Sequence, residues 1–436
     1  MNLMEKRQKN TNLKRQKIII KKLKKQVRGI TLIALVVTII VLLILAGVAL
    51  SLTVGDNGLF RRAEQATNTW RNAETNEQLA MEEVSDWMDG YPNGDGEDNA
   101  LKEITGNETE NTITQDKLGN PITIPAGFKV VNPEDDVTKG IIIEDVSAPG
   151  KTSDTKGSQF VWIPVGDVYT SADHTEENKV TITLGRYTFD STAGANYGKA
   201  TLVQSAENYA NETQLKTSSS SSYYYRELLK TTSSSNTKAK DIEDFVTKAT
   251  TSGGYYIVRY EAGDATATSS ARTGTNNVSN PNNPLTCKAG VYPYNYINQA
   301  DASKLCQEMY SSSNFESDLI NSYAWDTAIV FIQEFSGDTN YSQQRGRNTA
   351  RAVQKCGESI LDYNLDEGDE AQDKRCNIYD MAGNTREWST ETNSNTSYPC
   401  VTRGGYYSNT DNYTSRRFSY NTPYGGSISA RPTLYL

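Results

Sequence analysis

Histidine is almost absent from this 436-residue chain, which contains a single one, His174. Iron and copper sites commonly use several histidines, and Ser-His-Asp catalysis needs a histidine beside the nucleophile. His174 lies in an acidic, polar run, SADHTEEN, which is typical of a surface position. The composition therefore argues against histidine-based metal centres and against this class of hydrolase.

Cysteine is also scarce, and the five cysteines all lie in the last third of the chain. They form no CxxC pair and no zinc-like spacing, so we expect no zinc site. Because an odd number of cysteines cannot pair completely, two interpretations stay open. The domain is extracellular with one or two disulfide bonds and a free thiol, or the cysteines are small buried apolar residues.

Positive charge is scarce outside the N-terminus. The chain has 44 basic and 53 acidic residues, and residues 1–29 are strongly basic, so the remainder is more acidic than the overall charge of -9 indicates. An acidic body without a stripe of basic and aromatic residues is a poor match to phosphate backbones. We therefore expect no nucleic acid partner.

An uncharged run, residues 30–54, follows the basic residues 1–29. It exceeds the roughly 20 apolar residues that a helix needs to cross a bilayer. Because basic flanks stay on the cytoplasmic side, the pattern predicts a single-pass protein of the cell membrane with a cytoplasmic N-terminus and an extracellular C-terminal domain.

The sequence RGITLI at residues 28–33 resembles the leader of a type IV prepilin. The resemblance implies that a prepilin peptidase cleaves after Gly29 and methylates Ile30, and that other pilin-like subunits are candidate partners. The glutamate usual in that family at the fifth mature position is Ala34 here, which favours cleavage and anchoring over assembly into a pilus. An ordinary signal anchor is the alternative.

Three further segments follow, the last of which contains an insertion. Apolar residues recur at spacings of three and four over 55–88 and predict an amphipathic stalk helix, which packs on a pilin-like partner or on its own domain. Residues 89–121 are rich in glycine, asparagine and acids and are typical of a linker. A domain then spans 122–436, with a polar insertion at about 191–248 in which RELLK and DIEDFV fit short helices.

The domain alternates short strands with two helices. The stretches IPAGFKVV, GIIIEDV and SQFVWIPVG predict strands, and GGYYIVRYE at 253–261 predicts a central strand. Residues 298–310 and 322–335 carry apolar residues at helical spacing. The pattern indicates an α+β fold.

The motif NIYDMAGNTREW at 377–388 predicts a hairpin, with Ile378, Tyr379 and Met381 in one strand and 386–388 in the next. Together with RGGYY at 403–407 and ISARP at 428–432, it resembles the signature of the formylglycine-generating enzyme (sulfatase-modifying factor) family. The resemblance implies a C-type-lectin-like α+β domain over 122–436, carried on the long N-terminal membrane-spanning helix.

The oxidase chemistry of that family is not expected here. In the resembled enzymes two cysteines follow the RGG motif, and the corresponding positions are about Asn409 and Thr414. Neither side chain can supply a thiolate. We therefore expect no catalytic residues, no copper or iron, and no enzyme of this type; an oxidase acting on a protein cysteine is kept as an alternative.

The segment after RGG has the composition of a binding surface. Tyrosine supplies a rigid ring with a polar tip, and asparagine supplies adaptable hydrogen bonds. Lectin-like relatives, including variable proteins of diversity-generating retroelements, place their ligand surface in the comparable stretch. Ordinary composition is the competing explanation, because these residue types are abundant throughout the chain. The predicted contacts to a protein or glycan ligand are Tyr406, Tyr407, Asn409, Asp411, Asn412, Tyr413, Arg417, Tyr420 and Asn421.

Three other arginines in the motifs, Arg403, Arg416 and Arg431, are expected in scaffold ion pairs. Asn384 and Glu387 offer hard oxygen donors across a turn, where members of the resembled family bind Ca²⁺. A turn amide and a surface ion pair of Arg386 are the alternative.

The sequence thus predicts a membrane-anchored, pilin-like display protein with a non-catalytic, lectin-like, ligand-binding domain. The alternatives are the cysteine oxidase and a minor pilin with a structural domain.

Overall fold

The computed structural model describes residues 100–149, 155–206, 215–216, 224–226, 242–267, 284–361, 372–395, 397–408, 413–420 and 425–436, with isolated positions 12, 14, 15, 17 and 40. The chain divides into two units, Met1–Asp95 and Gly96–Leu436, and all elements below belong to the second. Within the described residues, no helix has the length and apolar character needed to span a bilayer. The predicted leader cleavage site, membrane helix and stalk lie outside these residues, apart from the isolated positions.

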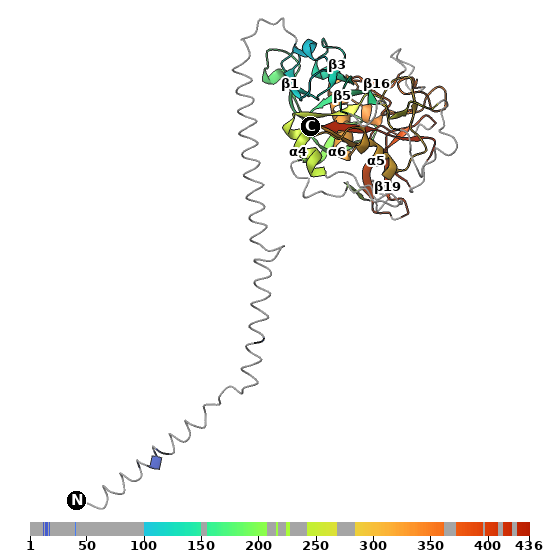
Figure 1. The fold of residues 1–436 in the computed structure, drawn as a ribbon. Coiled ribbons are helices and arrows are strands. Elements are labelled where there is room, and N and C mark those ends of the chain that lie inside the picture. The colour runs from blue at the N-terminus through green and yellow to red at the C-terminus, as the bar shows by residue number, and fades with distance from the viewer. Residues whose placement is uncertain are drawn as a thin grey trace, which may run out of the picture. The chain divides into compact units, whose positions relative to one another are not determined.

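A six-stranded antiparallel sheet forms the centre of the domain (Figure 1). The strand β12 has a neighbour on each side, so the predicted central strand is confirmed, as are the strands predicted before it. In spatial order the strands are β15 (Glu316–Leu319), β22 (Pro432–Tyr435), β12 (Gly254–Val258), β5 (Gln159–Pro164), β4 (Ile142–Asp145) and β3 (Phe128–Val130).

Both faces of this sheet are buried, which explains the unbroken apolar runs in its strands. Along β5, Phe160 and Trp162 belong to one core cluster, and Val161 and Ile163 belong to the other. The helix α5 (Gln299–Met309) contributes to the first cluster, whereas α4 (Ile242–Thr251) and α6 (Ser322–Phe335) contribute to the second. The two predicted helices are confirmed, and DIEDFV forms part of α4.

A second sheet carries the C-terminal motifs. Its path is β10-β11-β18-β19-β20, and β21 pairs with β18 in parallel. Two strands of the polar insertion, β10 and β11, thus extend this sheet. Arg226, the first residue of RELLK, is the last residue of β11 and does not belong to a helix. The strands are β10 (Leu215–Lys216), β11 (Tyr224–Arg226), β18 (Arg386–Asn393), β19 (Cys400–Arg403), β20 (Arg417–Tyr420) and β21 (Ile428–Ala430).

Short elements complete the described fold. Four 3₁₀ turns are present in this part of the chain: η1 (Ala100–Glu103), η2 (Val137–Lys139), η4 (Glu176–Asn178) and η6 (Tyr341–Gln343). The paired strands are β1 (Thr112–Gln115) with β2 (Pro121–Ile124), β6 (Gly166–Tyr169) with β7 (Lys179–Ile182), β8 (Gly185–Phe189) with β9 (Ala200–Ser205), β13 (Gly263–Asp264) with β14 (Tyr292–Pro293), and β16 (Lys374–Arg375) with β17 (Ile378–Tyr379). Since η1 and β1 lie within 89–121, secondary structure begins earlier than residue 122.

The hairpin predicted within NIYDMAGNTREW is wrong. The strand β17 pairs with β16 through a two-residue turn at Cys376 and Asn377, whose φ angles of 44° and 63° fit a type I′ turn. The strand β18 pairs with β19 and β21 instead. Positive φ angles at Asp380 (59°) and Asn384 (55°) redirect the chain between β17 and β18. Local alternation could not reveal this redirection.

All five cysteines lie in the described part of the chain, and none forms a disulfide bond. Cys287, Cys306, Cys356 and Cys400 are buried, in agreement with the apolar interpretation. His174 is exposed, as predicted, and its ring stacks on Tyr169 at 4.1 Å between centroids.

The N-cap of α6 provides a test of the fold. Asn321 Oδ1 accepts a hydrogen bond of 2.9 Å from the backbone N–H of Ala324. We expect Asn321→Ala to lower the free energy of unfolding by about 1 kcal/mol in urea denaturation, because an N–H of the first turn loses its acceptor. The matched control is Asn340→Ala, since Asn340 caps η6 without a side-chain hydrogen bond. Equal losses in both variants would contradict the role of this cap.

Candidate functional site

The C-terminal strands are attached to the core by a closed set of buried ion pairs. Arg403 on β19 contacts Glu391 on β18 (Nη1 to Oε2, 2.8 Å) and Asp326 on α6 through Nη2. Arg417 on β20 contacts the same two carboxylates, with 2.6 Å from Nε to Glu391 and 2.6 Å from Nη2 to Asp326. We call Asp326, Glu391, Arg403 and Arg417 the ion-pair ring.

The contacts of the ring favour the ionised states of Glu391 and Arg417. Burial opposes ionisation of Glu391, but Arg417, Arg403 and Arg186 outweigh it and lower its pKa to about 2. Burial likewise opposes the charge on Arg417, yet Asp326 and Glu391 raise its pKa above the ordinary value. Removal of one member leaves an unpaired buried charge. We therefore expect the loss of any one of them to lower the free energy of unfolding by about 3–5 kcal/mol.

The three sequence motifs meet beside this ring. Arg431 of ISARP pairs with Glu387 of REW at 2.7 Å. Gly404 of RGG has a φ of 76°, and a Cβ there would lie 2.6 Å from the carbonyl oxygen of Met381, so only glycine permits this approach. The scaffold ion pairs expected for Arg403 and Arg431 are confirmed. The three motifs therefore form a tightly packed scaffold beside the ion-pair ring.

A buried carboxylate lies under the GN turn. Glu261 accepts hydrogen bonds from the side chain of Asn384 and from both the backbone N–H (2.9 Å) and the hydroxyl of Thr385. Burial raises the pKa of Glu261 to about 7, although Thr385, Arg431 and Asn384 act against this shift. The hydroxyl of Thr385 also lies 2.6 Å from that of Ser429, which extends the hydrogen-bond network around this carboxyl group.

The two residues predicted to bind calcium are both buried. Asn384 Oδ1 accepts a 2.8 Å hydrogen bond from the backbone N–H of Gln354, and Glu387 Oε1 is bound by Arg431. Of the side-chain oxygen atoms of these two residues, only Glu387 Oε2 has no hydrogen-bond partner. Among the described residues, no group of three or more His, Cys, Asp or Glu side chains is arranged to hold a metal ion. Calcium binding stays a prediction, and it requires these hydrogen bonds to be exchanged.

The surface above the ring combines arginine and aromatic side chains. Arg386 is only 7% exposed, and its guanidinium lies 4.2 Å from the ring centroid of Tyr406 and 4.5 Å from that of Phe418. The rings of Tyr406 and Tyr407 meet edge to face at 5.4 Å. The guanidinium of Arg416 lies 5.2 Å from the ring centroid of Phe418, and the backbone N–H of Arg416 donates a hydrogen bond of 2.9 Å to the carbonyl oxygen of Tyr413. We call this region the arginine–aromatic surface, made of Arg386, Tyr406, Tyr407, Tyr413, Arg416 and Phe418.

Arg386 is the unusual member of this surface. Its Nε has no hydrogen-bond partner, and no carboxylate in the described part of the chain forms an ion pair with it. Burial lowers the pKa of Arg386, while Tyr406 and Tyr420 act in the opposite direction. A nearly buried cation without a counter-charge is costly, and the two aromatic faces offset only part of that cost.

The predicted ligand contacts divide into three groups. Tyr406, Tyr407 and Tyr413 are half-buried on the arginine–aromatic surface. Tyr420 packs edge to face on Trp388 at 6.0 Å, and Arg417 belongs to the ion-pair ring, so both support the surface from below. The other predicted contacts, Asn409, Asp411, Asn412 and Asn421, lie outside the described residues. The ligand contacts as a whole stay a prediction.

Sequence reasoning missed Arg386 and Phe418 as members of this surface. Arg386 stands in the REW motif, where the sequence analysis gave it a surface ion pair only as the alternative to a calcium site. The register of β19 with β20 pairs Thr402 with Phe418, and β18 runs beside β19. Only this pairing of strands brings residue 386 close to residues 406 and 418.

The positions that correspond to the oxidase thiols do not form a reactive centre in the described part. Thr414 is buried, and its carbonyl oxygen accepts a 3.0 Å hydrogen bond from Trp325 Nε1. Asn409 lies outside the described residues. Burial raises the pKa of all five cysteine thiols, to about 12 for Cys376 and Cys400. The described thiols are therefore protonated and weak nucleophiles near neutral pH.

Comparison with known proteins gives little. No protein-family model matches the chain, and no curated protein matches its sequence. Among solved structures, Treponema denticola variable protein 1 matches with 10% sequence identity over 66% of this chain and 100% of that chain, with a TM-score of 0.28. A TM-score this low does not establish a shared fold.

Glu261 and Glu391 predict how stability depends on pH. The pKa of Glu261 is raised in the folded state, so the fold gains stability as pH falls from about 7 towards 4.5, by at most about 1.4 kcal/mol per pH unit. The pKa of Glu391 is lowered to about 2, so its contribution is lost as pH falls below 4.5. Thermal unfolding should show the highest melting temperature near pH 4.5, where these two ranges meet.

The variant Glu261→Gln tests the assignment, because it cannot titrate. We expect it to reduce the rise in melting temperature between pH 7 and pH 5, to which Asp373, Asp380 and Glu387 also contribute because burial raises their pKa values. Glu334→Gln, at an exposed position, should leave the rise intact. An unchanged rise in Glu261→Gln would show that another group is responsible.

Proposed function

We propose that this chain is a membrane-anchored surface protein whose C-type-lectin-like domain binds an extracellular protein or glycan ligand and catalyses no reaction. The observation that carries the proposal is Arg386, a nearly buried guanidinium in contact with two aromatic rings and with no carboxylate partner among the described residues. A protein that needed only stability would gain from an apolar residue there. A ligand with acidic or hydroxyl groups would satisfy the cation.

The composition of the arginine–aromatic surface supports the same conclusion. Tyrosine and arginine are the residues that most often dominate binding energy, because each combines a large contact area with hydrogen-bonding groups. Tyr406, Tyr407 and Tyr413 are half-buried, so their rings are held by neighbours while part of each side chain faces solvent. A ligand would meet rigid groups, which lowers the entropy lost on binding.

The support beneath the surface favours binding by a fixed shape. The ion-pair ring joins α6, β18, β19 and β20 through ion pairs that are largely shielded from solvent. Strands held in this way position the rings of residues 406 and 418 against the guanidinium of Arg386. The raised pKa values of the cysteine thiols argue against the alternative, an oxidase that would need an accessible thiolate.

The proposed anchor comes from the sequence. The basic residues 1–29 and the uncharged run 30–54 support a signal-anchor topology, and RGITLI supports processing of the prepilin type. On this proposal the domain is displayed outside the cell, with assembly into a pilus secondary because Ala34 replaces the family's glutamate. An acidic surface domain agrees with a protein or glycan partner.

The ligand surface is tested with two single substitutions in the full-length protein. Screening on a glycan array and on intact cells supplies the binding signal. We expect Arg386→Met and Tyr406→Ala each to weaken that binding by about tenfold or more, because central arginine and tyrosine contacts dominate such interfaces. Arg386→Met should keep or raise the melting temperature, since it removes an unpaired buried charge.

Matched controls separate binding from folding. Arg351→Met changes an exposed arginine, and Tyr398→Ala changes a tyrosine that is 48% exposed in the turn between β18 and β19. Neither residue belongs to the arginine–aromatic surface. If both test variants bind as the unchanged protein does, this surface is not the ligand site.

Processing is tested independently by mass spectrometry of the protein from its native membrane. We expect the mature chain to begin at Ile30 with a methylated amino group, and Gly29→Leu to retain the leader. A wild-type chain that still carries residues 1–29 would contradict the prepilin-type anchor and leave a signal anchor.

A further inference from the structure

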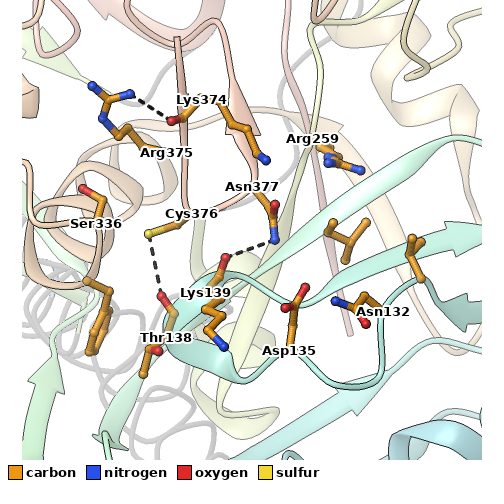
Figure 2. Close-up of a pocket in the computed structure, with 13 residues that line it drawn as sticks. Asn132, Asp135, Thr138, Lys139, Arg259, Ser336, Lys374, Arg375, Cys376 and Asn377 are labelled. Atoms are coloured by element: carbon orange, nitrogen blue, oxygen red, sulfur yellow. Dashed lines mark hydrogen bonds between the residues drawn. The ribbon is translucent and has the colours of Figure 1, made fainter. Parts of the chain in front are cut away.

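A pocket of about 640 Å³ opens between η2, the end of α6 and the β16–β17 hairpin (Figure 2). None of the residues that line it belongs to the arginine–aromatic surface. Sites for small organic molecules measure about 300–1,000 Å³, so the volume fits a molecule rather than a single ion. The pocket is therefore independent of the proposed ligand surface.

The pocket is built by specific contacts and not by loose loops. Asn377 Nδ2 donates to the carbonyl oxygens of Lys139 (3.1 Å) and Gly140 (2.9 Å). The thiol of Cys376 donates to the carbonyl oxygen of Thr138 (3.7 Å). A Cβ on Gly140 would lie 2.2 Å from the carbonyl oxygen of Cys376. Only glycine lets the hairpin turn rest on η2, so both walls are fixed before a ligand arrives.

The lining is cationic although the protein is acidic overall. Of its basic residues, Lys139 is paired with Asp136 (3.3 Å) and Arg375 with Asp338 (3.1 Å). Arg259 and Lys374 form no ion pair within the described residues. Two positive charges on one wall are therefore available for a ligand.

These two cations share one aromatic ring. The guanidinium of Arg259 lies 5.4 Å from the ring centroid of Tyr379, and the amine of Lys374 lies 5.8 Å from the same centroid. Arg259 Nη1 donates to Gln159 Oε1 at 2.8 Å, which fixes the plane of the guanidinium. A planar fork held in this way suits a carboxylate, and the lysine adds a second charge.

The opposite wall limits the charge of the ligand. Asp135 and Asn132 lie across the pocket from Arg259 and Lys374 (Figure 2). The carboxylate of Asp135 disfavours a doubly charged anion and accepts hydrogen bonds from hydroxyl groups, and the amide of Asn132 both donates and accepts. Phe335 supplies an apolar surface on the α6 side.

We propose that this pocket binds an acidic sugar, that is, a ring with several hydroxyl groups and one carboxylate. The carboxylate contacts Arg259 and Lys374, and the hydroxyl groups contact Asp135 and Asn132. The volume admits one or two sugar rings. The site gives the protein a second, charge-selective binding function.

Isothermal titration calorimetry of the full-length protein tests this assignment with glucuronate as the probe. Glucose has the same ring without the carboxylate, and inorganic phosphate is an anion without the ring. We expect glucuronate to bind more tightly than either. Lys374→Gln and Arg259→Gln should each weaken glucuronate binding by about tenfold, because each removes a charged hydrogen-bond donor.

The control is Lys355→Gln. Lys355 Nζ lies 5.8 Å from the ring centroid of Tyr292, which matches the placement of Lys374 over Tyr379, but it does not line the pocket. We expect this variant to bind glucuronate as the unchanged protein does. Lys374 makes no hydrogen bond through its amine in the described part, so Lys374→Gln is expected to keep the melting temperature even if Arg259→Gln does not.

Several outcomes would overturn the proposal. They are absence of glucuronate binding, equal binding of glucose, tighter binding of phosphate, and unchanged glucuronate binding in Lys374→Gln. A loss of binding in Lys355→Gln equal to that in Lys374→Gln would also overturn it, because it would trace the effect to overall charge.

Discussion

The C-terminal half of this domain depends on the ion-pair ring. Two arginines on neighbouring strands share two carboxylates, one on a helix and one on a third strand, so that every charge has two opposite charges in contact. Such a set is costly to desolvate and costly to break, and this makes it a device for specifying one arrangement more than a source of net stability. Here the ring fixes the positions of β19 and β20 relative to α6. It thereby also fixes the aromatic residues of the arginine–aromatic surface.

Several parts of the fold could be predicted from the sequence, because their signals are local. The helices of residues 298–310 and 322–335 and the central strand of residues 253–261 all formed as their apolar patterns indicate. The motif NIYDMAGNTREW was identified as structurally important but its path was not predicted. Its direction is set by positive φ angles at Asp380 and Asn384 and by partners more than 100 residues away, such as Glu261. Alternation of residue types contains no information about either.

The candidate sites show the same division. Tyr406, Tyr407 and Tyr413 could be selected by composition, since tyrosine after the RGG motif is visible in the sequence. Arg386 could not be selected, because its lack of an ion pair in the described structure and its two aromatic neighbours depend on strand pairing. The β16–β17 pocket was missed entirely. It combines residues from 131–142, 259, 335–336 and 374–377, and of these only Asn377 belongs to a motif that the sequence analysis singled out.

The place of β22 in the first sheet has a consequence for how the domain is made. This strand comes after every other strand in the chain, yet it lies between β15 and β12, with hydrogen bonds to both. A ribosome must therefore produce Pro432–Tyr435 before the sheet can close, and until then β12 and β15 each expose an unpaired edge. Folding of this sheet is thus delayed until β22 has been synthesised, and the growing chain must be kept from aggregating until this strand is available.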